Sequence, residues 1–297
     1  MFVFSGTSNV PLAQKITGYC HATNGEVMIE TFANGEKRVR VHSEVRRQEV
    51  VLVQSFSNPV DSNIMEFLLI ADALERAGAR RVIAVVPWMG YSLQDKVFTD
   101  GEPIAARVVA DLISHAYTKR VMLLDLHNSS IPGFFSVPST HVRAISLFEK
   151  YAREHFDVNQ VVVVSPDFGG LKQARVFADR LHVHLSNIDK HRDLDSGAVS
   201  TVGIAGAEVD GKICLVYDDV INTGGTVVEV AKFLKEKGAK EVHFMVSHGL
   251  FAGDGMQKMT DSAIDSVVIT DSIVQKDPLE KIKVISVAEL FAREILE

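Results

Sequence analysis

Two patterns of apolar and polar positions alternate along the chain. Short, almost purely apolar runs such as 81–87 are typical of strands that are buried on both faces of a parallel sheet. Longer segments such as 62–78 have apolar residues every three or four positions, which is typical of helices with one buried face. The pattern predicts strands at 2–5, 26–32, 37–41, 50–54, 81–87, 120–126, 160–165, 182–185, 212–217, 241–248, 266–270 and 283–287. It predicts helices at 11–18, 62–78, 102–115, 142–156, 170–181, 227–237, 251–262 and 288–296.

This alternation predicts an α/β protein, because strands joined through helices form parallel sheets with right-handed crossovers. A chain of 297 residues is long enough for two domains of ordinary size. We therefore predict two doubly wound parallel-sheet domains of similar topology, 1–142 and 143–297, with the last helix able to pack back on the first domain. Residues 189–211 contain few large apolar side chains and are predicted to form a mobile loop with an edge hairpin.

Composition and charge exclude several classes of protein. Hydrophobic content of 46% and charged content of 23% are ordinary for a soluble globular protein. The start of the chain resembles a strand and a turn rather than a signal peptide, and no apolar run approaches the ~18 residues of a membrane helix. Net charge of −7 argues against binding to nucleic acid or to an anionic membrane. Cys20 and Cys214 are far apart in the sequence, so we expect no disulfide framework and a cytoplasmic location.

Residues 216–226 carry the strongest chemical signal. Asp218 and Asp219 lie at the carboxyl end of a predicted strand, where they can accept hydrogen bonds from vicinal hydroxyls or hold a hydrated Mg²⁺. The turn that follows can present hydroxyls and backbone N–H groups to a phosphate at a helix N-terminus; it consists of Asn222, Thr223, Gly224, Gly225 and Thr226. No Gly-Lys-Ser/Thr follows, so this is not the common phosphate loop, and a strand capped by polar turn residues is the plainer alternative. We favour a sugar-phosphate site, because the stretch resembles the loop that binds phosphoribosyl diphosphate (PRPP) in the type I phosphoribosyltransferase fold.

A second loop of this kind lies at 165–170, between a predicted strand and a predicted helix. Its glycines can present N–H groups to an anion, and Lys172 and Arg175 follow on the helix. An ordinary Pro-Asp turn is the alternative. Two such loops in one domain favour a substrate with two phosphate-bearing ends.

Three further segments have both a functional and a structural interpretation. Lys190 and Arg192 place two cations before the polar segment, where they can close over the charge of a phosphoryl-transfer transition state or simply face solvent. His127 follows an apolar strand and is either a ligand or a polar turn residue. The Asn-Gly pair at Asn34 predicts a hairpin turn, in which Phe32 is functional or part of the core.

Together these motifs resemble those of the ribose-phosphate diphosphokinase (PRPP synthetase) family over nearly the full chain. The matching segments are 32–36, 54–60, 90–91 with 94–95, 102–104, 125–127, 132–135, 165–170, 189–192 and 218–226. The family moves the β,γ-diphosphoryl group of ATP to the C1 hydroxyl of ribose 5-phosphate, giving PRPP and AMP. The resemblance therefore implies a Mg²⁺-dependent transferase of nucleotide biosynthesis that binds ATP and ribose 5-phosphate and forms a homo-oligomer, a dimer or a hexamer of dimers.

The resemblance also implies roles by position. Five residues correspond to the ATP site, those of the hairpin being donated by a neighbouring subunit: Phe32, Asn34, Glu36, Gln94 and Asp95. The site for ribose 5-phosphate corresponds to Asp218 and Asp219 on the hydroxyls and, on the 5-phosphate, Asn222, Thr223, Gly224, Gly225 and Thr226. The pyrophosphate loop corresponds to Asp167, Gly169 and Gly170. His127 and Asp167 correspond to ligands of Mg²⁺ or of the transferred phosphates, and Lys190 and Arg192 to the catalytic cations.

The departures from the family pattern fall mainly on the ATP side. Asn34 stands where the family usually has Asp, and Leu93 stands where it has an arginine at the ATP phosphates. The basic run that normally follows is thinned in 96–101, and Asn222 replaces an Asp that is frequent in the PRPP loop. Loss of one charge-assisted contact weakens binding by about 1.5–3 kcal/mol, or ~10- to 100-fold, unless a cation such as Lys96 substitutes.

Two other functions are compatible with parts of the sequence. A non-catalytic regulatory homologue, which binds a catalytic PRPP synthetase, is favoured by Leu93 and opposed by Lys190 and His127. A phosphoribosyltransferase that consumes PRPP needs only the loop at 218–226 and leaves the motifs of the first half unexplained. Five residues of predicted loops are candidates either for subunit contacts or for buried anchors: Trp88, Met89, Phe98, Phe134 and Phe135.

The thinned basic run leads to a prediction about regulation. In the regulated class of the family this run contributes to control by phosphate and ADP, so we expect weak or absent inhibition of that kind. ADP is titrated at saturating phosphate while the formation of AMP is followed. Cooperative inhibition at low ADP would contradict the expectation.

Overall fold

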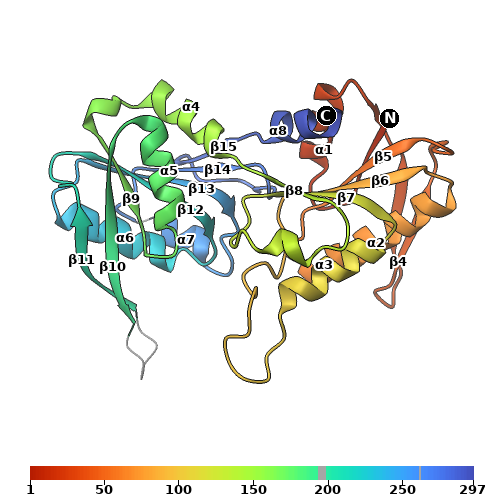
Figure 1. Ribbon diagram of the computed structural model, residues 1–297, viewed down its shortest axis with the longest axis horizontal. Coiled ribbons are helices and arrows are strands. Elements are labelled where there is room, and N and C mark those ends of the chain that lie inside the picture. Colours follow the sequence, from red (N-terminus) through yellow and green to blue (C-terminus); the bar gives the residue numbers. More distant parts are fainter. Residues whose placement is uncertain (193–198, 261) are drawn as a thin grey trace. The chain divides into compact units, whose positions relative to one another are not determined.

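The computed structural model describes residues 1–192, 199–260 and 262–297, without the side chains of 190–192 and 199–202 (Figure 1). The chain forms two compact units. Unit 1 comprises Met1–Arg143, Asp271–Val274 and Ser286–Glu297. Unit 2 comprises Ala144–Thr270 and Gln275–Ile285. Each unit has its own sheet and its own hydrophobic core.

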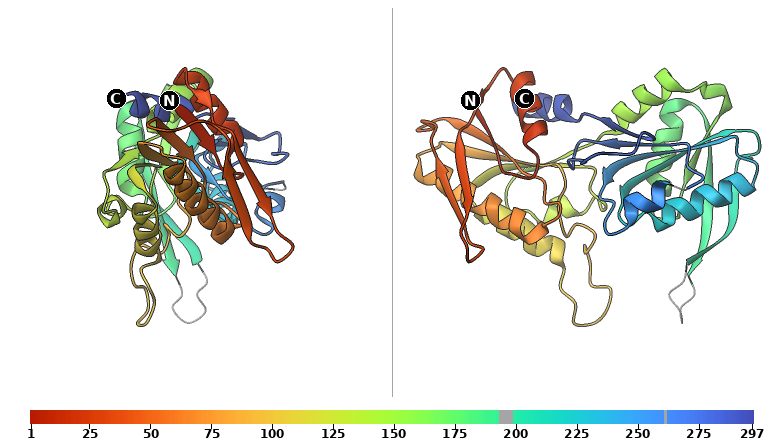
Figure 2. Two further views of the ribbon diagram at one scale, coloured as in Figure 1. Left: turned by 90° about the vertical axis from the view of Figure 1, so that its right-hand side faces the viewer. Right: turned by 180° about the vertical axis from the view of Figure 1, so that it is seen from behind.

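The main sheet of unit 1 is parallel. Its strands in spatial order are β2 (Thr23–Asn24), β1 (Phe2–Ser5), β5 (Glu49–Val53), β6 (Arg81–Val86), β7 (Thr118–Leu124) and β8 (Ser139–Val142). One face carries α2 (Val60–Arg76) and α3 (Ala105–His115), whose apolar sides form a core with strand residues such as Leu52 (Figure 2). On the other face α1 (Val10–Tyr19) lies against β1, and α8 (Ala288–Leu296) lies beside α1.

A two-stranded hairpin belongs to unit 1 in addition to this sheet. Strands β3 (Val27–Thr31) and β4 (Lys37–Val41) pair antiparallel. The turn between them closes with Phe32 N–H donating to the Glu36 carbonyl at 2.8 Å, and Gly35 adopts φ +90°, where glycine is strongly favoured. The hairpin predicted from the Asn-Gly pair is therefore confirmed.

The sheet of unit 2 has one antiparallel edge. Its strands in spatial order are β11 (Val199–Gly206), β10 (His184–Arg192), β9 (Val161–Ser165), β12 (Ile213–Ile221), β13 (Glu241–Gly249), β14 (Ser266–Thr270) and β15 (Ile282–Ile285). All neighbours are parallel except β10 and β11. Helices α4 (Ile145–His155) and α5 (Leu171–Leu181) cover one face; α6 (Gly225–Glu236) and the short α7 (Gly255–Thr260) cover the other (Figure 1).

Aromatic packing fixes the α4 and α5 face of unit 2. The ring of Tyr217 stacks on Phe177 at a centroid distance of 4.7 Å and meets the edge of Phe148 at 5.8 Å. Both phenylalanines are fully buried. Tyr217 directly precedes the acidic pair in β12, so this packing holds the carboxyl end of the strand in place.

The fold class predicted from the sequence is confirmed, and several predicted elements differ in their bounds, three of them as follows. The helix predicted at 142–156 begins only at Ile145, because Ser139–Val142 forms the edge strand β8. The helix predicted at 251–262 shortens to Gly255–Thr260, since Phe251 (φ +47°) and Gly253 (φ +64°) are left-handed. The segment 189–211 contains the end of β10 and all of β11, so the predicted edge hairpin is confirmed, while Lys190 and Arg192 lie on a strand and not in a loop.

The apolar loop residues divide into two groups. Trp88 and Met89 are buried, so they anchor their own loop. Phe134 and Phe135 are partly buried against the core of unit 1, and Phe98 is 60% exposed. Of these five candidates for subunit contacts, Phe98 is thus the one that solvent reaches most. Among the described residues no helix is both long and apolar enough to cross a membrane.

The packing of the C-terminal helix α8 within unit 1 gives a testable prediction. Phe291 of α8 is fully buried, so Phe291→Ala is expected to lower the free energy of unfolding of unit 1 by about 3–5 kcal/mol. Leu296→Ala on the same helix removes a side chain that is 61% exposed and is expected to change it by less than about 0.5 kcal/mol. Urea denaturation measures both variants. Equal effects would mean that α8 does not pack in solution as it does here.

Candidate active site

The acidic pair lies at the carboxyl end of β12, the strand predicted to carry it. Asp219 is 8% exposed, and Asp218 is partly buried. Asp218 Oδ1 accepts a hydrogen bond of 2.9 Å from the backbone N–H of Asp219. One carboxylate of the pair is therefore oriented by the strand itself.

Negative charge is concentrated around Asp218. Its burial raises its pKa well above the ordinary value, and the nearby charges of Asp219 and Asp167 raise it further. Carboxylates held together in this way favour a bound cation or hydrogen-bond donors, since either removes the repulsion. Hydroxyl groups of a sugar and a hydrated divalent cation both meet that need.

The loop after β9 joins the acidic pair because β9 and β12 are neighbouring parallel strands. Asp167 Oδ1 accepts a hydrogen bond of 3.0 Å from Gly170 N–H, and Ser165 Oγ donates to the Asp167 carbonyl at 2.7 Å. A Cβ atom added to Gly170 would lie 3.8 Å from both Asp167 Oδ1 and Asp218 Oδ1. The loop predicted to bind pyrophosphate and the predicted acidic pair thus lie beside each other.

Two helices of unit 2 begin at this edge of the sheet. The caps of α5 and α6 are Gly170 and Gly224, and neither can cap with a side chain, so backbone N–H groups at these starts remain for an anion. Gly224 adopts φ +76°, and an added Cβ would lie 2.6 Å from Met259 Cε. The left-handed backbone therefore favours glycine at this position, and a larger residue would also displace the end of the Met259 side chain of α7.

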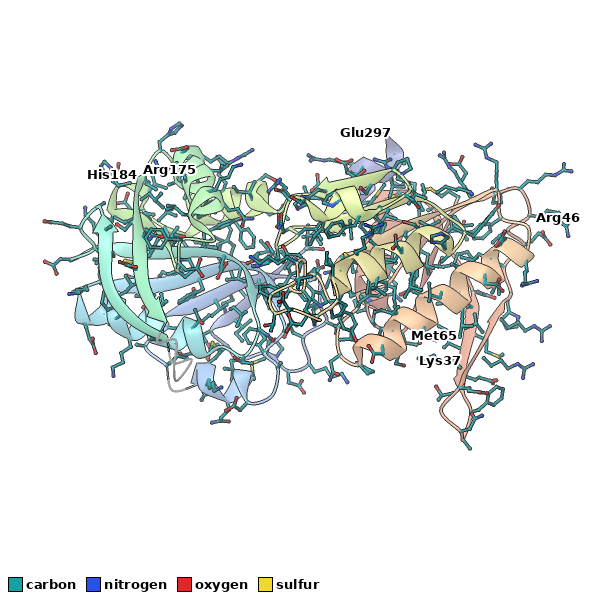
Figure 3. All side chains as sticks on the ribbon, turned by 60° about the horizontal axis from the view of Figure 1, so that its bottom comes forward. Lys37, Arg46, Met65, Arg175, His184 and Glu297 are labelled. Carbon is teal, nitrogen blue, oxygen red and sulfur yellow. The ribbon has the colours of Figure 1, made fainter. Side chains whose placement is uncertain are left out.

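The remaining residues of the 222–226 loop are held by α7 and its preceding turn. Ala252 N–H donates to the Asn222 carbonyl at 2.8 Å, and a Cβ on Gly255 would lie 3.2 Å from the Thr223 carbonyl. Gly225 opens α6, followed by Thr226. Lys172 and Arg175 of α5 are exposed, and Figure 3 marks the position of Arg175. These cations can raise the positive potential on one side of the site.

Unit 1 brings together a second group of predicted residues. Asn128 Nδ2 donates to Asp95 Oδ2 at 2.5 Å, which places the loop of Gln94 and Asp95 beside His127 at the carboxyl end of β7. His127 is exposed. Its neighbour Leu126 donates its backbone N–H to Nε2 of His141 at 2.9 Å.

Asn128 and His141 were not predicted from the sequence. His141 must accept at Nε2, which assigns the proton of a neutral ring to Nδ1. Asn128 directly follows the Asp-Leu-His motif, and this position could have indicated that it helps to hold the neighbouring loop. His141 lies on a short polar edge strand, for which the sequence has no comparable signal.

The predicted adenine residues sit at the tip of the β3–β4 hairpin. Phe32 is 48% exposed, and Asn34 and Glu36 are exposed as well. Asn34 Oδ1 accepts a hydrogen bond of 3.1 Å from Glu36 N–H, so the residue that replaces the expected Asp shapes the turn. The tip presents its aromatic ring to solvent or to another molecule.

Two residues of the predicted ATP side show how its charge is arranged. Leu93 is partly buried, and Lys96 Nζ lies 5.1 Å from the centroid of the Phe98 ring. The Lys96 ammonium group is attracted to the face of this ring, and it would lose that attraction if it moved to a phosphate. The side chains of Lys190 and Arg192 lie outside the described residues.

The donor set suits Mg²⁺. Mg²⁺ is commonly bound by one or two carboxylates and several waters, so Asp167 beside the acidic pair is sufficient for it. Among the described residues, no group of three or more His, Cys, Asp or Glu side chains could hold a metal by themselves. A harder cation that keeps most of its waters fits this arrangement better than Zn²⁺, which usually takes three or four protein ligands.

Comparison with known proteins agrees with this geometry. A family model for the N-terminal domain of ribose phosphate pyrophosphokinase matches residues 1–116, and one for the phosphoribosyl transferase domain matches 139–280. The ribose-phosphate pyrophosphokinase of Thermotoga maritima is 40% identical over 298 residues, which cover 100% of this chain and 94% of that protein. That of Fusobacterium nucleatum is 39% identical, with 99% and 93% covered.

A solved structure is similar over the same length. The phosphoribosylpyrophosphate synthetase of Mycobacterium smegmatis is 34% identical and matches with a TM-score of 0.92, covering 99% of this chain and 97% of that one. Two family models, full-length relatives and a full-length structural match therefore agree. The chain belongs to the ribose-phosphate pyrophosphokinase family.

Proposed function

We propose that this protein is a ribose-phosphate diphosphokinase that makes PRPP and AMP from ATP and ribose 5-phosphate. The observation that carries the proposal is the meeting of two glycine loops and an acidic pair at the ends of β9 and β12. Full-length relatives with this activity in their names support it. They also disfavour a non-catalytic regulatory subunit and a PRPP-consuming transferase.

Ribose 5-phosphate is assigned to unit 2. Asp218 and Asp219 accept hydrogen bonds from the ribose hydroxyls, which relieves the repulsion that raises the pKa of Asp218. The 5-phosphate binds the N-terminus of α6 through the turn of residues 222–226. The diphosphoryl group binds the loop of Asp167, Gly169 and Gly170 at the N-terminus of α5.

ATP is assigned to two segments of unit 1. Gln94 and Asp95, held beside His127, face its phosphates. The hairpin tip with Phe32, Asn34 and Glu36 holds adenine in a neighbouring copy, so the protein acts as a homo-oligomer. The exposed Phe32 ring supports this assignment, since an aromatic ring in solvent is suited to stack on a base.

The reaction requires positioning more than covalent chemistry by the protein. The C1 oxygen of ribose 5-phosphate forms a bond to the β-phosphorus of ATP as the bond from that phosphorus to the oxygen bridging it to the α-phosphorus breaks. AMP leaves with that oxygen, and the hydroxyl proton passes to solvent. Mg²⁺, held by Asp167 and the phosphates with His127 as a further candidate ligand, would neutralise charge on the diphosphoryl group. Lys190 and Arg192 stabilise the charge that spreads over it in the transition state.

The proposed setting is the cytoplasm, without a membrane or nucleic-acid partner. Cys20 and Cys214 are both buried free thiols, which suits a reducing compartment. The net charge of −7 disfavours polyanions as partners.

An assay of the purified protein with ATP, ribose 5-phosphate and Mg²⁺ tests the proposed function. AMP is expected to form in amounts equal to PRPP. Lys190→Ala is expected to reduce kcat by at least ~100-fold and to bind ribose 5-phosphate as before, because the lost charge acts on the transition state. Lys232→Ala on α6, with a side chain 75% exposed, is the matched control and is expected to keep full activity. No AMP from the wild-type protein would refute the proposal.

Substitution of Asp218 separates stability from activity. Asp218→Asn keeps the acceptor for Asp219 N–H and removes the charge that repels Asp219 and Asp167. Without ligands, we expect a gain of about 1 kcal/mol in the free energy of unfolding of unit 2, or ~2–4 °C in Tm. The affinity for ribose 5-phosphate is expected to fall ~10- to 100-fold, since its hydroxyls lose a charged acceptor.

Differential scanning calorimetry and titration of ribose 5-phosphate measure these two effects. Asp72→Asn is the control, because Asp72 is exposed and pairs with Arg76 on the surface of α2. This control is expected to change neither quantity appreciably. A lower Tm for Asp218→Asn than for wild type would show that Asp218 is not under charge repulsion.

A further inference from the structure

A fully buried carboxylate lies outside the site described above. Glu66 of α2 is 0% exposed and lies on the apolar side of the helix with Phe67 and Ile70. A buried carboxylate is costly unless it is paired and hydrogen-bonded. A charged residue on the apolar face of a helix is therefore a signal of a specific buried partner.

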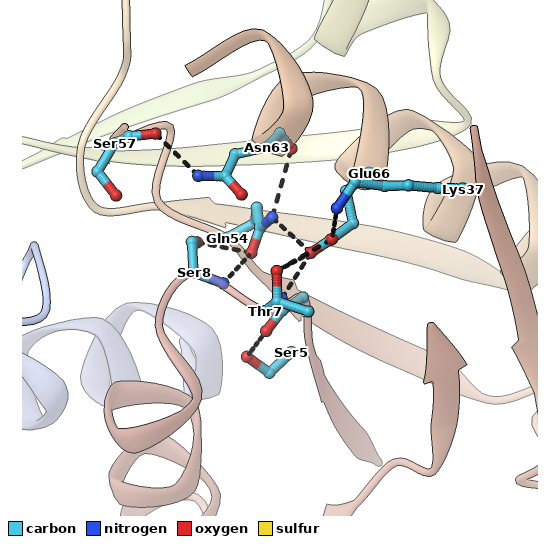
Figure 4. Close-up of polar contacts among 9 residues, drawn as sticks. Ser5, Thr7, Ser8, Lys37, Gln54, Ser57, Asn63 and Glu66 are labelled. Carbon is cyan, nitrogen blue, oxygen red and sulfur yellow. Dashed lines mark hydrogen bonds and ion pairs between the residues drawn. The ribbon is translucent and has the colours of Figure 1, made fainter. Parts of the chain in front are cut away.

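The partner of Glu66 is the first residue of the hairpin strand β4. Lys37 Nζ forms an ion pair and a short hydrogen bond with Glu66 Oε2 (Figure 4). The side chain of Lys37 is 14% exposed. Residues of β4 alternate between partly buried and exposed, with Lys37, Val39 and Val41 on the inner face. The Lys37 side chain thus lies on the same face of β4 as Val39 and Val41, the face that contacts the rest of unit 1.

The other oxygen contacts of Glu66 come from two rigid elements. Thr7, which follows β1, donates to Glu66 through its backbone N–H at 2.5 Å and through Oγ1 at 2.9 Å to Oε1 and 3.0 Å to Oε2. Gln54, which follows β5, donates from Nε2 to Oε1 at 2.9 Å (Figure 4). Burial alone would raise the pKa of Glu66, but the hydrogen bonds from Lys37 and Thr7 lower it below its ordinary value. The carboxylate is therefore charged and immobile.

The surrounding amides and hydroxyls fix the network further. Gln54 Oε1 accepts from Ser8 Oγ at 2.7 Å, and its Nε2 also donates to the Asn63 carbonyl at 3.3 Å. Asn63 Nδ2 donates to the Ser57 carbonyl at 2.8 Å. A Cβ on Gly6 would collide with the amide of Gln54, so the chain approaches it as closely as it can. Lys37 is thus tied to a part of unit 1 that has little freedom to move.

The ion pair of Lys37 with Glu66 lies close to the tip of the hairpin. Lys37 directly follows Glu36, and the exposed tip 32–36 continues from the ends of β3 and β4. Towards the base, Val27, Ile29, Val39 and Val41 pack on the core of unit 1. Of the inward contacts of β4, the one nearest the tip is the ion pair of Lys37. Its geometry is fixed, because hydrogen bonds from Thr7 and Gln54 hold the Glu66 carboxylate in place.

We infer that the Lys37–Glu66 ion pair positions the hairpin tip, and that it thereby sets the affinity of the protein for ATP. This inference rests on the proposed function, in which Phe32, Asn34 and Glu36 hold adenine. The two charged residues do not touch the nucleotide; they act through the tip. Because ribose 5-phosphate is bound by unit 2, the pair affects the two substrates differently.

The control for this inference lies on the same strand. Arg38 is the next residue, points to the outer face and pairs with Glu30 at 3.8 Å, and both side chains of that pair are more than half exposed. Strand β4 contacts α2, and Figure 3 labels Lys37 of β4 and Met65, the neighbour of Glu66 on α2. Arg38→Met therefore removes a cation of similar length from the same hairpin without touching the buried network.

The experiment compares KM for ATP, KM for ribose 5-phosphate and kcat among variants. Lys37→Met is expected to raise KM for ATP about tenfold, as would the loss of one contact between the displaced tip and the nucleotide, and to leave KM for ribose 5-phosphate within about twofold. Lys37→Arg is expected to restore most of the affinity for ATP, since it keeps the charge. Arg38→Met is expected to match wild type in both constants.

A double variant separates positioning from stability. Lys37→Met leaves the buried carboxylate without its counter-charge and lowers Tm. Lys37→Met with Glu66→Gln removes both charges and keeps an acceptor for Thr7, so Tm is expected to return close to that of wild type. If KM for ATP stays about tenfold raised in this stable variant, the ion pair positions the tip. If KM for ATP returns to the wild-type value together with Tm, the pair is only structural and the inference is wrong.

Hydrogen exchange keeps this test independent of the proposed function. Amides of residues 32–37 are expected to exchange faster in the double variant than in wild type and in Arg38→Met, because the tip has lost its nearest anchor. Faster exchange without any ATP-dependent activity in wild type would refute the proposed function and leave the anchor established. Unchanged exchange would refute the anchor whatever the enzyme does.

Discussion

The protein depends on how its buried carboxylates are compensated. Glu66 in unit 1 receives an ammonium group and several hydrogen-bond donors from its own chain, and its pKa is lowered although it is fully buried. Asp218 in unit 2 lies beside two further carboxylates, and its pKa is raised. The same functional group thus serves opposite purposes: one carboxylate is satisfied by the fold, and the other is left to be satisfied by what binds.

Parallel strand order explains where the second kind of carboxylate lies. The carboxyl ends of β9 and β12 are adjacent, so the loops that leave them share one edge of the sheet. Two helices begin at the same edge with glycine at their caps, which adds N–H donors opposite the carboxylates. A ligand with hydroxyls at one end and phosphates at the other satisfies both. Ribose 5-phosphate and the diphosphoryl group that it receives have this combination.

The residues proposed to bind ATP are organised differently, around contacts between loops. Asn128 holds Asp95 beside His127, and the hairpin tip is exposed at some distance along the chain from both. Leu93 removes a charge that the family places there, and Lys96 lies over Phe98. In the proposed ATP site the nucleotide would meet fewer charges, so the geometry of the remaining contacts would matter more. A rigid tie such as Lys37–Glu66 is one way in which the chain can hold those contacts in place without adding charge at the site.

Four features could be predicted from the sequence: the α/β alternation, the turn at Asn34-Gly35, the acidic pair and the glycine loops. Each is encoded in neighbouring residues, through side-chain period or backbone freedom. It did not reveal β8, since a four-residue polar edge strand has no period of its own. The contacts between distant residues emerged from the folded chain: Asp167 with Asp218, Asp95 with Asn128, and Lys37 with Glu66. Such pairs depend on strand order and on the path of the chain between elements, and no local pattern specifies either.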